Sequence, residues 1–154
     1  MSTLDLRIPP PLVAVVVAAA MVGAALWLPP VLALPSGLRI GAALVLACIG
    51  LGFDVAGLVA FRKAKTTVNP LRPERSTQVV STGIYRITRN PMYLGLVLVL
   101  LGLAVYLASP WALLGPLAFA AYITRFQIRL EEQALTTRFG AAYTAYCKQV
   151  RRWL

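Results

Sequence analysis

Four long apolar runs, divided by proline-containing or polar segments, dominate the pattern of this chain. They cover residues 12–28, 38–61, 92–108 and 111–127. Prolines 9–11 precede the first run and Pro29-Pro30 follows it, as expected at the start and the end of a helix. The 17 residues of that run form a helix of about 26 Å, which approaches the thickness of a bilayer core. The pattern predicts four transmembrane helices, with Ser109-Pro110 as the turn of the last hairpin.

The remaining segments are polar. Residues 62–91 contain basic, proline and glycine positions, and they predict a long cytoplasmic loop. From Arg129 onward, apolar residues recur every three or four positions, which predicts an amphipathic helix over 129–150. We expect this helix to lie on the membrane surface or over the cytoplasmic mouth of the bundle. The predicted fold class is all-α, a single integral membrane domain over 1–154.

Composition supports the membrane prediction. Of the 154 residues, 59% are hydrophobic and only 13% are charged, with a mean hydropathy of +0.75. Soluble domains average roughly 45–50% apolar and about 25% charged residues, so a water-soluble fold is nearly excluded. A secretory signal peptide is the competing interpretation of the first run, because small residues follow it at 31–33. We expect that run to be retained as a helix.

Charge sets the expected orientation. Lys and Arg number 15 against 5 Asp and Glu, and 13 of the 15 lie in residues 62–92 and 125–154. Basic segments between apolar runs follow the positive-inside rule. Both termini and the loop are therefore expected on the cytoplasmic side, in a bacterial inner membrane. Nucleic-acid binding is the alternative explanation of the charge, but that class usually carries its basic residues on a soluble scaffold.

The inventory of reactive residues excludes several chemistries. The chain contains no His, which excludes a Ser-His-Asp hydrolase and His-ligated zinc or haem. Cys48 and Cys147 have no metal-ligand companions at a suitable spacing, and we expect no metal site. Asp54, within the second run, is expected to pair with a loop arginine. Small residues around it, such as Gly50 and Gly57, predict close helix packing.

Polar side chains flank the last two apolar runs. Arg86, Arg89 and Asn90 precede the third run. Arg125 lies at the end of the fourth, and Glu131-Glu132 follows it. A helical hairpin brings its two ends together, so we expect these groups to converge in one partly apolar pocket.

Two separated blocks carry a resemblance to a known family. The first is Thr82-Gly83-Ile84-Tyr85-Arg86-Ile87-Thr88-Arg89-Asn90-Pro91-Met92-Tyr93-Leu94-Gly95. The second is Glu131-Glu132, followed by Phe139-Gly140, Tyr143, Tyr146 and Val150-Arg151-Arg152-Trp153. Together they resemble the isoprenylcysteine carboxyl methyltransferase family, whose relatives include membrane phospholipid N-methyltransferases. The resemblance covers roughly residues 65–154.

The resemblance implies transfer of a methyl group from S-adenosylmethionine to a lipophilic, membrane-delivered or prenylated acceptor, with a carboxylate or a thiol as the nucleophile. It implies a helical cofactor site made of Gly83, Tyr85, Arg89, Asn90, Pro91, Tyr93, Leu94, Gly95, Glu131 and Glu132. The block made of Gly83, Tyr85 and residues 89–95 would hold the adenosine and the methionine carboxylate. Glu131 or Glu132 would hold the amino group or the ribose, and Arg125 would orient the substrate carboxyl. Arg125, Glu132 and Arg89 are the implied catalytic residues. Membrane lipid is an expected partner and nucleic acid is not.

One position departs from the family. Many members have His where this chain has Asn90, and an amide cannot titrate.

Each assignment also has a structural alternative. Arg86 and Arg89 can anchor the chain at the lipid interface, and paired acids are favoured in the first turn of any helix. Tyr85 and Tyr93 can belong to an aromatic belt. Two other functions stay open, an NADPH-dependent membrane reductase of the sterol-reductase type and a non-enzymatic lipid-binding protein.

Overall fold

In the computed structural model, residues 8–27, 35–64 and 78–154 are described, and every regular element among them is a helix. The longer helices are α1 (Pro10–Trp27), α2 (Ser36–Lys63), α3 (Pro91–Leu107), α4 (Leu114–Ile123), α5 (Arg129–Phe139) and α6 (Ala141–Gln149). Two 3₁₀ turns, Gly83–Arg86 and Pro110–Leu113, precede α3 and α4. A π-helical turn, Thr124–Ile128, joins α4 to α5. The predicted all-α class is confirmed.

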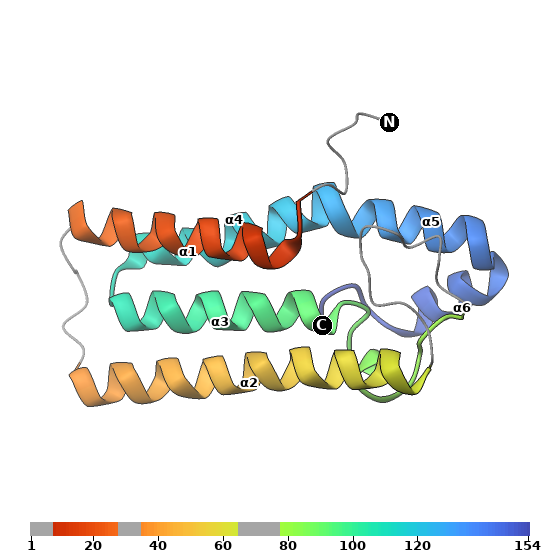
Figure 1. The fold of residues 1–154 in the computed structure, drawn as a ribbon, viewed down its shortest axis with the longest axis horizontal. Helices are drawn as coiled ribbons and strands as arrows, with labels where there is room; N and C mark the ends of the chain where they lie inside the picture. The colour runs from red at the N-terminus through yellow and green to blue at the C-terminus, as the bar shows by residue number, and fades with distance from the viewer. Residues whose placement is uncertain (1–7, 28–34, 65–77) are drawn as a thin grey trace.

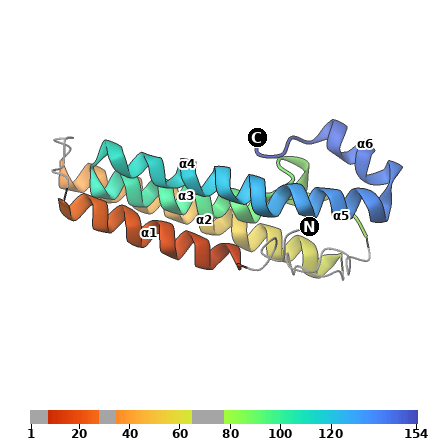
Figure 2. The same cartoon turned by 90° about the horizontal axis from the view of Figure 1, so that it is seen from above.

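Helices α1 to α4 lie side by side along the long axis of the molecule, and successive helices run in opposite directions (Figures 1 and 2). The carboxyl end of α2 and the amino end of α3 therefore lie at the same end of the bundle, where α5 and α6 extend beyond it (Figure 1). The polar segments on either side of the last hairpin meet at this end.

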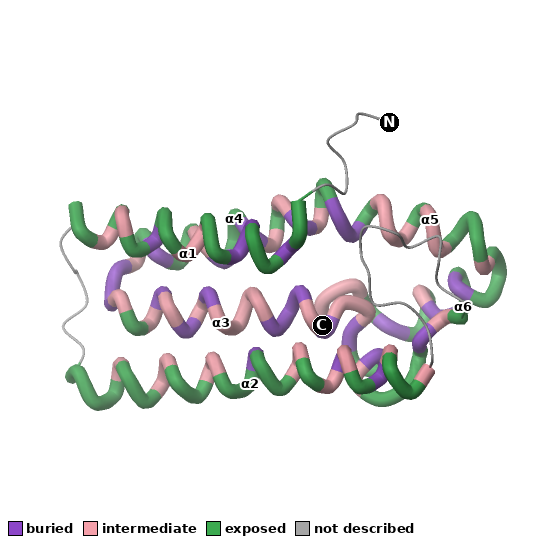
Figure 3. The backbone as a smooth tube through the Cα atoms, viewed as in Figure 1, coloured by how far each residue is buried: buried purple, intermediate pink, exposed green. Residues whose placement is uncertain are grey.

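Two helices, α1 and α2, are long and apolar enough to cross a membrane, with mean hydropathies of 2.0 and 2.3. Most residues of both helices are exposed or partly exposed (Figure 3), and the exposed ones include many large apolar side chains. Only 17% of each apolar window is buried. Helices in the core of a soluble protein are mostly buried, so these faces are suited to lipid. The apolar α3 has 17 residues, and the fourth run is divided into 3₁₀, α and π segments. The predicted four spans stay a prediction.

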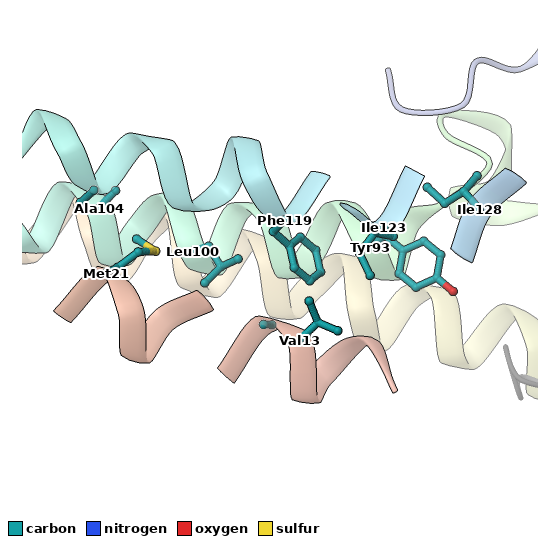
Figure 4. Packing of buried hydrophobic residues seen from close by; sticks show 10 residues of the cluster. Val13, Met21, Tyr93, Leu100, Ala104, Phe119, Ile123 and Ile128 are labelled. Carbon is teal, nitrogen blue, oxygen red and sulfur yellow. The ribbon is translucent and has the colours of Figure 1, made fainter. Parts of the chain in front are cut away.

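The bundle core lies where α1, α3 and α4 meet. Phe119 and Ile123 of α4 are fully buried, and they pack in one cluster with Leu100 of α3 and Val13 of α1 (Figure 4). Tyr93 extends this cluster toward the polar end of the bundle. The apolar core and the polar groups beyond it are thus continuous.

Helices α2 and α3 approach each other closely at glycines. A Cβ atom placed on Gly95 would lie 2.6 Å from the Gly50 carbonyl oxygen, and one on Gly50 would lie 2.6 Å from the Gly95 carbonyl oxygen. Gly57, two turns further along α2, is similarly covered by Met92. The small residues of the second apolar run therefore serve the close helix packing that the sequence predicts.

The C-terminal segment differs from the single helix predicted over 129–150. The structure has two helices, α5 and α6, because Gly140 between them adopts φ +52° and ψ −122°, a conformation open essentially to glycine. The apolar period continues across the break, since Leu135, Phe139, Tyr143, Tyr146 and Val150 share one cluster with α2 and the 3₁₀ turn. Ala142 is exposed.

The predicted loop over 62–91 is partly helical. Helix α2 continues to Lys63, and Gly83–Arg86 forms a 3₁₀ turn. Residues 65–77 of this loop lie outside the described residues.

Candidate active site

The segment before α3 is held by the chain that follows α6. The Arg89 backbone amide donates to the Arg151 carbonyl oxygen at 3.0 Å. The Asn90 side-chain amide and the Thr88 hydroxyl both donate to the Arg152 carbonyl oxygen, at 2.9 and 3.2 Å. Thr88 is fully buried. Residues 88–90 and 151–152, some sixty positions apart in sequence, thereby form one wall.

Glu132 of α5 joins this wall to the rest of the site. Its carboxylate accepts two hydrogen bonds from Arg152, at 3.0 Å from Nε and 2.6 Å from Nη2. Arg89 Nη1 lies 3.1 Å from Oε1 of the same carboxylate, and it also donates to the Cys147 sulfur of α6 at 2.6 Å. These are charge-assisted contacts. The contact between Arg152 and Glu132 is bidentate, which fixes the guanidinium and the carboxylate relative to each other. Glu132 is engaged by arginines on both oxygens.

Glu131 points to a different set of neighbours. The Tyr93 hydroxyl of α3 donates to Glu131 Oε1 at 2.5 Å, and the Gln127 amide donates to the same oxygen at 3.0 Å. Gln127 is buried and belongs to the π-helical turn, a distortion often found at functional sites. Burial raises the pKa of the Glu131 carboxyl to about 7, although the two hydrogen bonds oppose that rise. At neutral pH this carboxyl exchanges readily between its acid and its base form.

Aromatic residues close the site on the α2 side. The Tyr146 hydroxyl donates to the Tyr85 carbonyl oxygen at 2.7 Å, and the Tyr85 ring meets Phe61 of α2 edge to face. Burial raises the pKa of both Tyr85 and Tyr146 above the usual range, so both phenols are neutral. They give the polar cluster an apolar border.

An open hollow adjoins the cluster. Its volume is about 500 Å³, within the roughly 300–1,000 Å³ typical of small-molecule sites. It is lined by Arg129, Glu132, Gln133, Thr136, Thr137 and Arg152. Glu132 and Arg152 thus belong both to the hollow and to the wall described above.

The structure brings some of the residues predicted for the site together and leaves others apart. Arg89, Asn90, Tyr93, Glu131 and Glu132 take part in the contacts described above, and Tyr85 borders them. Pro91 and Leu94 are buried in the first turns of α3.

Three predicted residues are placed differently. Gly95 is packed against Gly50 and Asp54, whose Oδ1 has no hydrogen-bond partner among the described residues. No ion pair joins Asp54 to the described loop arginines, and the loop arginines Arg72 and Arg75 lie outside the described residues. Gly83 is exposed at the start of the 3₁₀ turn. Arg125 is exposed beside the Phe126 ring, and no contact within the described residues joins it to the cluster.

Sequence reasoning missed three residues of the cluster. Arg152 lies in the second resembling block, but the resemblance gives it no role, and the spacing of Cys147 bears only on metal binding. Gln127 is an uncharged polar residue at the end of an apolar run, which is itself a signal of function.

Comparison with known proteins identifies the chain. Residues 38–142 match the family model described as phospholipid methyltransferase. The chain belongs to this family. Protein-S-isoprenylcysteine O-methyltransferase B of Arabidopsis thaliana is 30% identical over 96 residues, which are 60% of this chain and 47% of the relative. A probable protein-S-isoprenylcysteine O-methyltransferase of Oryza sativa is 30% identical over 114 residues, which are 72% of this chain and 58% of the relative.

The chain spans about half the length of these plant relatives. An uncharacterized protein of Haemophilus influenzae is 44% identical over 63 residues, 41% of this chain and the whole of the relative. No solved structure gives a significant match. The predicted resemblance to isoprenylcysteine methyltransferases and their phospholipid-methylating relatives is confirmed at the level of the family.

Proposed function

We propose that the protein is an integral-membrane methyltransferase that uses S-adenosylmethionine and acts on a lipophilic or membrane-delivered acceptor. The observation that carries this proposal is the contact between the two resembling blocks. Arg89, from the block before α3, lies 3.1 Å from Glu132 in the block after α4, and Tyr93 bonds to Glu131. Membership of the phospholipid methyltransferase family supports the same activity.

The residues at this end of the bundle fit the cofactor. It carries a sulfonium cation, an amino-acid zwitterion and an adenosine, which call for carboxylates, arginines and an apolar surface. Glu131 and Glu132 provide the carboxylates. Arg89 has a buried Nε without a hydrogen-bond partner among the described residues. Tyr85, Tyr93 and the residues from Asn90 to Leu94 supply amide and apolar surface, whereas Gly95 supports the site from the α2–α3 contact.

When bound, the cofactor supplies a methyl group on a positively charged sulfur. The chain itself has to align the acceptor with that group and to exclude water, and positioning alone is worth roughly 7–11 kcal/mol. Arg89 and Glu132 hold the two blocks in register. A predicted role for Arg125 in orienting an acceptor carboxyl requires it to engage the acceptor from its exposed position.

The protonation state of the acceptor decides whether a base is needed. A carboxylate is already ionised at neutral pH, whereas a thiol must first lose its proton. Asn90 cannot accept that proton, but the Glu131 carboxyl has its pKa near 7 and can. The site therefore suits a carboxylate acceptor without a base and a thiol acceptor with Glu131 as the base.

The proposal includes a membrane arrangement. The four apolar runs cross the membrane, and the termini together with the 62–91 loop lie in the cytoplasm of a bacterial cell. The basic residues at the site end of the bundle support this orientation.

Calorimetry on the detergent-purified protein tests the activity. We expect binding of S-adenosylhomocysteine in the micromolar range and no binding of NADPH. The reverse pattern would indicate a reductase of the sterol-reductase type, and binding of neither would favour a non-enzymatic lipid-binding protein.

A pair of arginine variants tests the site. Arg89→Ala should abolish binding of S-adenosylhomocysteine while helicity by circular dichroism is retained. Arg86→Ala is the matched control, because Arg86 is an exposed arginine in the same block. Equal affinities of the two variants for S-adenosylhomocysteine would show that Arg89 does not contribute to the binding site.

A further inference from the structure

The hollow on the outer side of the cluster has an excess of positive charge. Among the residues that line it, Glu132 is the acid, and Arg129 and Arg152 are the bases. Glu132 is already paired with Arg152 and also with Arg89. Arg129 is exposed and makes no ion pair within the part of the chain that the structure describes. Within the lining, one negative charge thus faces two positive charges, and Arg89, outside the lining, is a third positive charge on the same carboxylate.

The hydrogen-bonding groups of the hollow are divided between donors and acceptors. A guanidinium has five N–H groups, and the bidentate contact with Glu132 uses two of those on Arg152. The Thr136 hydroxyl donates to the Glu132 carbonyl oxygen, and the Thr137 hydroxyl donates to the Gln133 carbonyl oxygen. Both threonines line the hollow, and each hydroxyl oxygen keeps lone pairs that can accept a further hydrogen bond. Arginine donors and hydroxyl acceptors together match a group that carries a carboxylate and an ammonium.

We propose that Arg129 and Arg152 form a carboxylate subsite that takes the amino-acid end of the cofactor. This inference rests on the proposed function, and it names the residues that bind one end of the cofactor. Glu132 is then a positioning residue, which holds the Arg152 fork while the remaining N–H groups of that fork receive the carboxylate. Thr136 and Thr137 accept from the ammonium. Neither Arg129 nor Arg152 is part of the site implied by the family resemblance.

Two adenosine thioethers that differ only in the amino-acid end can be compared as ligands to test this subsite. S-adenosylhomocysteine carries the amino-acid group, and 5′-methylthioadenosine lacks it. In calorimetry, Arg129→Gln should weaken binding of S-adenosylhomocysteine about tenfold or more, since a charge-assisted hydrogen bond is lost. The affinity for 5′-methylthioadenosine should stay unchanged. Arg129→Lys, which keeps the charge, should restore part of the loss.

Arg138→Gln is the matched control, because it removes the same charge from an exposed position of α5 that does not line the hollow. It should change neither affinity. Equal losses for both thioethers in Arg129→Gln, or no loss for either, would overturn the subsite while the proposed function stands. If the unaltered protein binds neither thioether, the proposed function fails and the subsite fails with it.

The carboxylate that binds to Arg129 and Arg152 could also belong to the acceptor instead of the cofactor. N-acetyl-S-farnesylcysteine, a prenylated cysteine with a free carboxylate, is the probe for that source. Its affinity should be the same in Arg129→Gln as in the unaltered protein. A loss confined to this probe would overturn the assignment to the cofactor and give the subsite to the acceptor.

Discussion

Glu131 and Glu132 are neighbours in sequence but have separate environments. Consecutive helical residues are rotated by about 100°, so their side chains leave α5 in different directions. Glu131 meets Tyr93 and Gln127, whereas Glu132 meets Arg89 and Arg152. A family motif that is written as a pair therefore contains two chemical roles. One acid is partly buried and has a raised pKa, and the other joins two arginines.

The raised pKa of Glu131 makes stability depend on pH. Between its ordinary value of 4.5 and about 7, the folded protein binds this proton more strongly than the unfolded chain does. This contribution to stability is complete below pH 4.5 and is lost as the pH rises through 7. Since one pKa unit corresponds to about 1.4 kcal/mol, we expect the contribution to be about 3 kcal/mol. Glu131→Gln should flatten the dependence of the unfolding midpoint on pH between pH 5 and 8.

Thermal unfolding in detergent at several pH values measures this effect. Glu132→Gln is the matched control, since it changes the adjacent carboxylate instead. A slope that is the same in Glu131→Gln and in the unaltered protein would show that Glu131 is ionised normally.

At the residue scale, the sequence predicts which segments meet better than which atoms do. The Arg89 and Tyr93 block and the twin glutamates lie together, because a hairpin joins the ends of its two helices. Arg125 differs, since it belongs to the π-helical turn and points outward. A π-helical turn rotates the side chains that follow it to a different side of the helix. The spacing of the apolar residues in the sequence does not reveal such a turn. The functional roles of these residues stay predictions.

Among the elements, the contact between α2 and α3 depends on glycine. Gly95→Ala would place a methyl group within 2.6 Å of the Gly50 carbonyl oxygen, so the helices must separate. We expect a loss of roughly 1–3 kcal/mol in unfolding free energy, as for other overpacked interiors. Gly52→Ala is the control, because a Cβ there meets nothing within 4 Å. Equal unfolding midpoints for the two variants in detergent would contradict this account of the contact.

The break between α5 and α6 depends on the backbone of Gly140. Alanine disfavours φ +52° with ψ −122°, and such strain costs about 1–3 kcal/mol. Gly140→Ala should therefore loosen α6 and weaken binding of S-adenosylhomocysteine. Hydrogen exchange of α6 is the direct measurement. Unchanged protection of α6 would mean that another conformation accommodates the alanine.

The sequence could not easily predict this break. Residues on both sides keep the three-to-four spacing that predicts one amphipathic helix, and only the glycine itself indicates a stop. Periodicity reports which face is apolar, and that face was identified correctly for Leu135, Phe139, Tyr143 and Tyr146. It does not report whether the helix axis is continuous.

At the scale of the whole molecule, the site and most of the described basic residues share one end of the bundle. If that end is cytoplasmic, single cysteines at opposite ends should react from opposite sides. In a Cys48→Ala, Cys147→Ala background, a membrane-impermeant maleimide should label Trp111→Cys in intact spheroplasts. Ser81→Cys should react only after permeabilisation. Both native positions are exposed in the structure.

The opposite labelling pattern would invert the proposed orientation. Labelling of both cysteines in intact spheroplasts would argue against the four-span arrangement.

Hydropathy identifies four apolar runs in the sequence, because each run is long enough to be recognised. It could not determine how many become regular helices of spanning length. Local prolines and the turns at 110–113 and 124–128 shorten the regular part of the fourth run, and α3 ends at Leu107. Length and composition alone therefore support two membrane helices, and the other two need the labelling experiment.

The wall made by residues 88–90 and 151–152 has a practical consequence for anyone who purifies this protein. Its hydrogen bonds join segments that are distant in the chain, so they form only after the hairpin has closed and α6 has docked. A harsh detergent can undo that assembly while each helix remains intact, and circular dichroism will not register the loss. We therefore expect the heat of S-adenosylhomocysteine binding, rather than helical content, to report whether a purified sample is native.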